Sequence, residues 1–177
     1  KEILKEDTVM GSALKKAIQK SQESKTIKNV KYIPSKDPYL INDSKKWDFQ
    51  KEARDIFIEE KIGILEMATG TGKTKTSLGI LSELLNQKKI NKIIIQMDGN
   101  ALLSQWDEEV TNEWLETRPE NIRVVRNFKN FKKLDLFKQN YDNKENIDLL
   151  ITSRSNLLEV LNFIQNKDNT KTIIIHD

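Results

Sequence analysis

Two glycines, a lysine and three threonines stand close together in the stretch Met67-Ala68-Thr69-Gly70-Thr71-Gly72-Lys73-Thr74. Glycine lets backbone N–H groups approach an anion closely, and a helix that begins directly afterwards adds the positive end of its dipole. In such a loop the lysine reaches the β- and γ-phosphates of a nucleotide, and the hydroxyl after it binds Mg²⁺. The stretch therefore predicts a phosphate site with Lys73 as a catalytic residue and Thr74 as a metal ligand.

This stretch departs from the strict pattern G-x-x-x-x-G-K-[ST], because Met67 stands where the first glycine is expected. The shorter form T-G-x-G-K-T is intact. A glycine-rich turn with a surface lysine is the structural alternative. The apolar run Ile62-Gly63-Ile64-Leu65 before the loop and the helical pattern after it favour phosphate binding.

A carboxylate at the end of another strand is the second requirement of a nucleotide site that uses Mg²⁺. Asp177 is the first carboxylate after the apolar strand pattern 172–176, and we expect it to be a catalytic metal ligand. The structural alternative is an ordinary aspartate at a strand end, where turn chemistry favours it. Asp148 is the second candidate, but it lies inside a strand pattern.

Strand and helix patterns that would position these residues alternate along the chain. Apolar runs typical of buried strands cover residues 62–65, 91–97, 122–125, 147–152 and 172–176, and amphipathic helical patterns cover 48–60, 75–87, 101–116, 128–140 and 154–166. This alternation predicts an α/β fold, a parallel sheet with helices on both faces, whose ligands bind at the carboxyl ends of the strands. The loop 68–74 and Asp177 both lie at such ends.

The N-terminal part has a different character. A helical stripe over residues 8–24 precedes a polar segment, residues 25–46, in which we predict a short extended piece at 30–33. We divide the chain into residues 1–45, an N-terminal helix and linker from the end of an upstream module, and residues 46–177, an α/β lobe that is incomplete at its C-terminus. The start at Lys1 and the end on a strand pattern favour a piece of a longer protein.

Composition excludes several classes of protein. The chain has no cysteine and one histidine, which excludes disulfides and thiolate metal sites and disfavours a zinc site. It has no apolar run of about 18 residues and no signal-peptide pattern, so we expect a cytoplasmic protein without a membrane partner. The net charge of +3, from 30 basic and 27 acidic residues, is too small to predict nucleic-acid binding by itself.

The segment Glu66–Thr74 resembles motif I of the superfamily 2 helicases, above all the DEAD/DEAH-type group that includes the motor subunits of restriction enzymes. Upstream, Trp47-Asp48-Phe49-Gln50 is similar to the Arg-x-Tyr-Gln motif of this family, with Trp47 in place of the arginine and Phe49 in place of the tyrosine. The resemblance implies that Gln50 reads adenine and that Phe49 lies beside the base. It covers residues 46–177 and implies a RecA-like P-loop lobe that uses ATP and Mg²⁺.

Two further segments are similar to family motifs that contact nucleic acid. The segment 98–106 resembles motif Ia, with Asp98 where proline is common; an acidic residue beside phosphates is unfavourable, so Asp98 should point elsewhere. The segment 151–155 is similar to motif Ib. The resemblance implies that the nucleic-acid contacts are Gly99, Asn100, Gln105, Thr152, Ser153 and Arg154. Trp106 lies on a helix stripe, and we interpret it as a packing residue.

Ile175-His176-Asp177 resembles the opening of motif II, whose Glu-x-His remainder is missing from this sequence. The resemblance thus implies an ATP-dependent helicase or translocase that acts on nucleic acid, DNA rather than RNA. Its expected partners are a second RecA-like lobe in the same longer chain and an attached nuclease module. Four lysines, Lys129, Lys132, Lys133 and Lys138, fall in the helical pattern 128–140, and we interpret them as its solvated face.

Two alternatives remain at this stage. The first is another P-loop ATPase, kinase or nucleotide switch that does not act on nucleic acid; it would share residues 69–74 but would not require Gln50. The second is a non-catalytic interaction fragment. Because the sequence lacks the water-activating glutamate and a second lobe, we predict that residues 1–177 alone bind nucleotide weakly and hydrolyse essentially none.

Overall fold

The computed structural model describes residues 37–39 and 47–177, which all belong to one compact unit, Ile33–Asp177. The helix predicted over residues 8–24 and the extended piece at 30–33 lie outside the described residues. Within the described residues, no helix combines the length and the apolar character needed to cross a bilayer.

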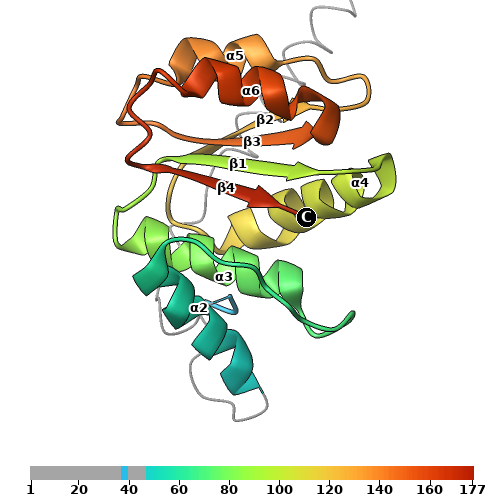
Figure 1. Cartoon of the computed structure of the whole chain (residues 1–177), viewed down its shortest axis with the longest axis vertical. Helices are drawn as coiled ribbons and strands as arrows, with labels where there is room; N and C mark the ends of the chain where they lie inside the picture. Colours follow the sequence, from blue (N-terminus) through green and yellow to red (C-terminus); the bar gives the residue numbers. More distant parts are fainter. Residues whose placement is uncertain (1–36, 40–46) are drawn as a thin grey trace, which may run out of the picture. The chain divides into compact units, whose positions relative to one another are not determined.

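Four strands form one parallel sheet: β1 (Lys92–Met97), β2 (Ile122–Asn127), β3 (Ile147–Ser153) and β4 (Thr172–His176). Their spatial order is β2-β3-β1-β4, so β1 lies inside the sheet and pairs with both β3 and β4 (Figure 1). The last four apolar runs predicted from the sequence correspond to these four strands, with bounds that differ by at most two residues. The predicted α/β class with a parallel sheet is therefore confirmed.

Helices cover both faces of the sheet. The described α-helices are α2 (Asp48–Glu60), α3 (Lys73–Asn86), α4 (Asn100–Glu108), α5 (Leu134–Asn140) and α6 (Leu157–Ile164), of which α2 and α3 precede β1 and α2 packs against α3. α5 and α6 lie on one side of the sheet, and α3 and α4 lie on the other (Figure 1). After α4 the chain continues as a π-helical segment, Glu109–Trp114, and a 3₁₀ turn, Leu115–Thr117, so the predicted helix 101–116 is present but not regular.

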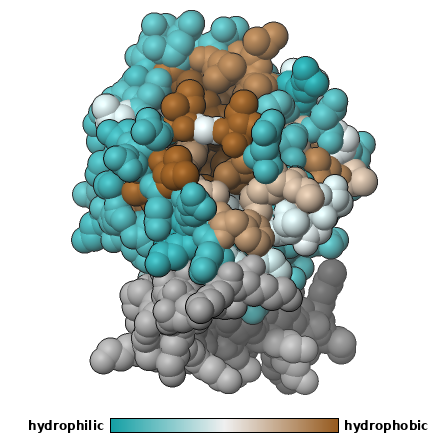
Figure 2. Space-filling view, turned by 60° about the horizontal axis from the view of Figure 1, so that its bottom comes forward, coloured by the Kyte–Doolittle hydropathy of each residue, from teal (hydrophilic) through white to brown (hydrophobic). Residues whose placement is uncertain are grey.

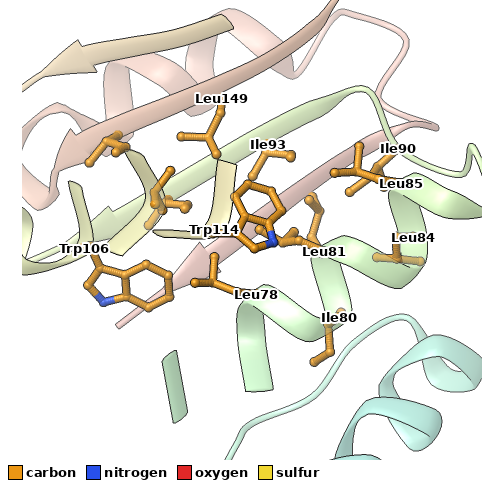
Figure 3. Packing of buried hydrophobic residues seen from close by; sticks show 14 of the residues in the cluster. Leu78, Ile80, Leu81, Leu84, Leu85, Ile90, Ile93, Trp106, Trp114 and Leu149 are labelled. Atoms are coloured by element: carbon orange, nitrogen blue, oxygen red, sulfur yellow. The ribbon is translucent and has the colours of Figure 1, made fainter. Parts of the chain in front are cut away.

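Alternation along β1 divides the core into two clusters, as the period of a strand requires. Ile93 and Ile95 belong to one cluster with Leu81 and Trp114, and Figure 3 shows Ile93 close to these two side chains. Ile94, between them, belongs to the second cluster with residues of α5 and α6. Both faces of the central strand are thus buried, which explains its continuous apolar run.

Three polar groups inside this core are paired. Trp114 is fully buried, and its Nε1–H donates to the Ser82 hydroxyl at 2.9 Å. At the amino end of the sheet, the buried Lys92 ammonium donates to Asp148 at 3.0 Å, and Arg123 donates to the other carboxylate oxygen at 2.8 Å. Asp148 therefore serves an ion pair at the edge opposite the strand ends, which removes it as a metal ligand for Asp177's site.

The first predicted strand, residues 62–65, is not part of the sheet. These residues are extended but pair with no described strand, and Ile62 and Ile64 are 82% and 90% exposed. A strand requires a neighbour for its backbone groups, and a cleft of about 410 Å³ lies between this segment and β4. The prediction of a buried strand here is wrong for that reason. Figure 2 shows hydrophobic residues gathered around a hollow on one face of the molecule.

The helix predicted over residues 128–140 begins later than expected, at Leu134. Phe128 and Phe131 are joined by a turn in which the Phe131 N–H donates to the Phe128 carbonyl at 2.9 Å. Spacing of three residues suits a turn as well as a helix, so the aromatic pattern did not distinguish them. Lys129, Lys132 and Lys133 consequently lie in a loop after β2, and their interpretation as a helix face is wrong.

Candidate nucleotide and nucleic-acid site

The glycine-rich loop lies directly before α3, as its sequence predicts. Gly70 and Gly72 have φ values of +81° and +87°, a region that side-chain-bearing residues rarely adopt. Gly72 is the residue before the first turn of α3, and no side chain of the described residues caps this helix end. The first N–H groups of α3 therefore remain available to an anion.

Lys73 is the first residue of α3, and its ammonium folds back over the loop. Its Nζ donates to the Met67 carbonyl at 2.9 Å and approaches the Ala68 carbonyl at 3.5 Å. The Thr71 hydroxyl also donates to the Ala68 carbonyl, at 2.6 Å. Lys73 and Thr71 thus donate to carbonyl groups of the loop itself. Both donors would have to leave these carbonyls in order to bind a phosphate.

Gln50 joins α2 to this loop. Its side-chain Nε2 donates to the Thr71 carbonyl at 2.8 Å, and the residue is only 3% exposed. A Cβ on Gly72 would lie 2.5 Å from the same nitrogen, so a side chain there would displace the Gln50 amide from Thr71, while the positive φ by itself favours glycine. The Gln50 Oε1 finds no partner among the described residues, which leaves one buried acceptor for a donor such as an exocyclic amine.

The aromatic residue beside Gln50 is placed differently from the sequence expectation for its helix. The amphipathic pattern 48–60 places Phe49, Ala53, Ile56 and Phe57 on one face, yet Phe49 is 41% and Ile56 is 54% exposed. The helix turns Gln50 inward instead, and Phe49 lies on the surface 6.0 Å from the ring of Trp47. An aromatic side chain is therefore available to a planar ligand next to the buried amide.

Lys73 and Asp177 line the same cleft of about 410 Å³, between the extended segment 63–65 and β4. The two residues that the sequence proposed for phosphate and metal are 104 positions apart in the numbering (177 − 73) and are brought together by the parallel sheet. The Asp177 Oδ2 accepts a hydrogen bond from the Trp106 indole at 2.9 Å, and its backbone N–H donates to the Gln96 carbonyl at 3.0 Å.

Trp106 is 2% exposed, so its interpretation as a packing residue agrees with the structure. Its hydrogen bond to Asp177 was not foreseen, because no local pattern joins residues so far apart. Gln96 was missed entirely: it is fully buried in β1, its Oε1 contacts His176 Nδ1, and its Nε2 has no partner among the described residues. A polar side chain in an apolar strand was the available signal.

The residues present supply two of the oxygen ligands that a nucleotide-bound divalent cation needs. No group of three acidic or histidine side chains within the described residues forms a metal site by itself. Thr74 and Asp177 offer a hydroxyl and a carboxylate oxygen, and Mg²⁺ usually completes its octahedron with water and substrate phosphates. The donor set therefore suits a metal that arrives with a nucleotide.

The expected nucleic-acid residues meet at the ends of β1 and β3. Gly99, with φ at +83°, turns the chain from β1 into α4 at Asn100, and both residues are exposed. Asp98 does not point away from this segment as expected: its Oδ1 accepts the Gly99 N–H at 3.0 Å, and its other oxygen lies 4.0 Å from Arg154. Arg154 remains 67% exposed in its side chain and can exchange this carboxylate for a phosphate.

The three remaining expected contacts differ in access. Thr152 is fully buried, and its hydroxyl donates toward the Asn127 carbonyl at 3.3 Å. Ser153 is partly exposed and shares its hydroxyl with Ser155 and Asn156. Gln105 is exposed on α4. The geometry thus offers Ser153 and Gln105 to a ligand and turns Thr152 inward.

Comparison with known proteins gives one result. The family model described as type III restriction enzyme, res subunit, matches residues 15–177. No curated protein and no solved structure gives a significant match to the chain.

Proposed function

Since the chain belongs to the type III restriction enzyme res subunit family, a superfamily 2 helicase-like domain, we propose that it is the ATP-binding lobe of a nucleic-acid helicase or translocase. The observation that carries this proposal is the meeting of three residues distant in sequence: Gln50 contacts the loop, and Lys73 and Asp177 line one cleft. DNA is the proposed substrate, in a larger restriction or defence enzyme.

In this proposal Thr69, Gly70, Thr71, Gly72 and the start of α3 hold the phosphates of ATP. Lys73 exchanges the Met67 carbonyl for β- and γ-phosphate oxygens, a stronger acceptor for an ammonium group. The buried Oε1 of Gln50 accepts the amino group of adenine, and Phe49 lies beside the ring. Thus one amide connects base recognition to the phosphate loop.

Mg²⁺ would bind the Thr74 hydroxyl and the Asp177 carboxylate, directly or through water, and would neutralise charge on the phosphates. Trp106 holds one oxygen of Asp177 in place, so the carboxylate is oriented before the ion arrives. The positive end of the α3 dipole would also stabilise the negative charge of the phosphates, because anions are favoured at a helix N-terminus.

Nucleic acid would cross the ends of β1 and β3 in this proposal. Gly99 and Asn100 offer backbone N–H groups once Asp98 is displaced, and Arg154 supplies a charge-assisted contact. Gln105 and Ser153 add neutral donors. Thr152 would join them only if β2 and β3 separated, because its hydroxyl faces Asn127.

ATP binding by the 177-residue chain is the direct test. A fluorescent ATP analogue should bind in the presence of Mg²⁺, and Lys73→Ala should weaken binding by at least about tenfold through loss of charge-assisted contacts. Gln50→Ala should reduce the preference for ATP over GTP while GTP binding stays unchanged. Equal affinity of wild type and Lys73→Ala would contradict the proposal.

Nucleic-acid dependence separates the alternatives. In a longer chain that continues past Asp177 into a second lobe, DNA should stimulate ATP hydrolysis more than RNA does. ATP hydrolysis that ignores both would favour another P-loop ATPase or nucleotide switch. The 177-residue chain by itself should hydrolyse essentially no ATP, since a second lobe supplies groups for the transition state. Robust turnover would refute that expectation.

A further inference from the structure

The loop after β2, residues 128–133, presents an unusual surface at the carboxyl edge of the sheet. Residues 129–133 are all exposed, and they include three lysines and one phenylalanine. Because β2 is parallel to β1 and β3, this loop lies at the same edge as Asn100 and Ser153. It belongs to neither the nucleotide loop nor the segments expected to contact nucleic acid.

A pocket of about 550 Å³ opens between this loop and the ends of the neighbouring strands. Lys129, Phe131 and Lys132 line it on the loop side, and Asn100 and Ser153 line it on the side of β1 and β3. Its lining is therefore shared between the loop and two of the residues proposed to contact nucleic acid. We refer to it as the strand-end pocket.

Phe131 is held as a platform within this pocket. Its ring is 43% exposed and meets Phe128 edge-on, with centroids 5.8 Å apart and planes inclined by 64°. The Arg126 guanidinium lies 5.9 Å from the centroid, and Asp107 fixes that guanidinium at 2.8 Å. A ring fixed in this way has lost most of its freedom already, so stacking on it costs little further entropy.

The lysines are arranged on the same loop. Lys129 adopts φ of +51°, an uncommon conformation for a residue with a side chain, and its ammonium contacts the Ser104 hydroxyl on α4. Lys132, the residue after Phe131 in the sequence, is exposed and lines the same pocket. Backbone strain of this kind persists where the surroundings determine it and is common at binding sites. An exposed aromatic ring and two lysines on one short loop suit a base and the phosphates next to it.

Two carboxylates limit where a phosphate can lie. Asp135 and Glu159 also line the strand-end pocket, and Glu159 is paired with Lys138. Phosphates are repelled from that side, so a nucleic-acid backbone would follow the side of Lys129 and Lys132. The base would then point toward Phe131.

We propose that residues 128–133 form a stacking site for one unpaired base of single-stranded nucleic acid, with Phe131 as the platform and Lys129 and Lys132 as phosphate contacts. The site extends the strand-end track of the proposed function, on which it rests. Base pairing hides the face of a base inside the stack, so duplex nucleic acid cannot use the site in the same way.

Binding of a fluorescently labelled single-stranded oligonucleotide by the 177-residue chain tests this site. Phe131→Ala should weaken binding by about tenfold, the range expected for one stacked base, without changing the dependence on salt. Phe131→Trp should preserve or strengthen binding. Lys132→Ala should instead reduce the slope of log K against log salt by about 0.7, because one phosphate contact is lost.

The control for Phe131→Ala is Phe163→Ala. Phe163 also has two lysines near its ring, Lys138 and Lys167, but it packs on Tyr141, away from the strand-end pocket. The Phe163→Ala variant should bind the oligonucleotide with the same affinity as the wild type. Phe131→Leu keeps an apolar side chain without a π face and should reproduce the loss, which separates stacking from folding.

Two results overturn the inference. If wild type binds and Phe131→Ala and Phe131→Leu bind equally well, the stacking site is wrong while the proposed function stands. If wild type prefers duplex and Phe131→Ala leaves single-strand affinity unchanged, the site is likewise wrong. Absence of any nucleic-acid binding by wild type would overturn the proposed function together with the site.

Discussion

Trp106 joins the helix that follows β1 to the carboxylate at the end of the chain. It belongs to α4, whose first residues lie at the proposed nucleic-acid track, and its indole N–H donates to Asp177 at 2.9 Å. A movement of α4 on nucleic-acid binding would therefore reach the carboxylate through one hydrogen bond. In the proposed function Trp106 would act on Mg²⁺ only through Asp177, as a positioning residue.

Trp106→Phe keeps the buried ring but removes this donor. We expect the Mg²⁺ concentration needed for half-maximal ATP binding to rise by about fivefold, the equivalent of one hydrogen bond of roughly 1 kcal/mol. Trp114→Phe is the control, because that indole donates to Ser82 in the core and not to the site. Equal shifts in both variants would show that core packing, and not the contact with Asp177, sets the metal requirement.

Gly72 is restricted by its conformation and by its contact with Gln50, whereas Gly70 is restricted by conformation alone. A Cβ at Gly72 would lie 2.5 Å from Gln50 Nε2, and a Cβ at Gly70 would meet nothing within 4 Å. Both Gly→Ala variants should lose about 1–2 kcal/mol because φ is positive, and Gly72→Ala should lose more. Chemical denaturation should show that Gln50→Ala partly rescues Gly72→Ala and leaves Gly70→Ala unimproved; no difference between the two backgrounds would contradict the contact.

At the scale of elements, α3 is packed closely enough to require a glycine. A Cβ at Gly79 would lie 2.5 Å from the Tyr39 carbonyl oxygen, and Tyr39 is itself held near Asp37, whose carboxylate pairs with Arg118. The segment 37–39 therefore cannot move away freely.

Gly79→Ala should destabilise the fold by about 1–3 kcal/mol, as overpacking does, although alanine favours a helix intrinsically. Gly63→Ala is the matched control: its Cβ would make an ordinary contact of 3.6 Å with Phe57. The free energy of unfolding in urea measures the difference. A Gly79→Ala variant as stable as wild type would show that Tyr39 does not approach α3 so closely.

Glu109, in the π-helical segment, makes the stability of the fold depend on pH. Burial first, and then the neighbouring Glu113 carboxylate, raise the pKa of Glu109, while Lys75 opposes them. A carboxyl with a raised pKa holds its proton more tightly in the folded state, so stability is greatest below the unfolded value and falls as pH rises through the folded one.

Glu109→Gln should therefore raise the melting temperature at pH 7 and leave it nearly unchanged near pH 4. The gain should be small because the Glu109 side chain is only partly buried and solvent screens its charge. Glu116→Gln, an exposed residue two positions after the segment, is the control. A gain at pH 4 equal to that at pH 7 would exclude a titration of Glu109 as the cause.

Sequence patterns predicted those elements whose periodicity reflects burial. β1 and β3 were recognised because both faces are covered, and α3 because Leu78, Leu81 and Leu85 pack inward. Residues 62–65 have the same apolar composition, but pairing depends on a neighbour that composition cannot reveal. In the loop 128–133, the spacing of three residues between Phe128 and Phe131 belongs to a turn and not to the helix that it suggested.

In the candidate site, too, local patterns predicted some residues, while others depend on contacts between distant parts of the chain. Residue types predicted the phosphate loop, a resemblance predicted a role for Gln50, and both stay predictions. The contacts that make the site specific, Gln50 with Thr71 and Trp106 with Asp177, join residues 21 and 71 positions apart. No local rule predicts such contacts, because they arise only when the sheet brings the strand ends together.

For the molecule as a whole, the extended segment beside β4 is an exposed hydrophobic surface. Ile62 and Ile64 are almost fully exposed, Ile174 is 40% exposed, and no described strand pairs with the outer edge of β4. Exposed edges of this kind pair with other chains. We expect the 177-residue chain to self-associate as its concentration rises.

Ile64→Lys should shift sedimentation velocity profiles toward the monomer, since a charge at an edge opposes pairing. Leu158→Lys is the control, because Leu158 is 72% exposed as an isolated residue on α6. A wild-type chain that stays monomeric throughout the concentration series would contradict this expectation.

The strand order also has a consequence for synthesis on the ribosome. β1 lies at the centre of the sheet, but its neighbours come late in the sequence: Lys92 bonds to Asp148 across 56 positions, and Gln96 contacts His176 across 80. At about 5–20 residues per second, the most apolar strand waits roughly 4–16 seconds for its second neighbour. A nascent chain in that interval exposes both edges of β1, which makes this strand the part of the molecule most in need of chaperone protection during translation.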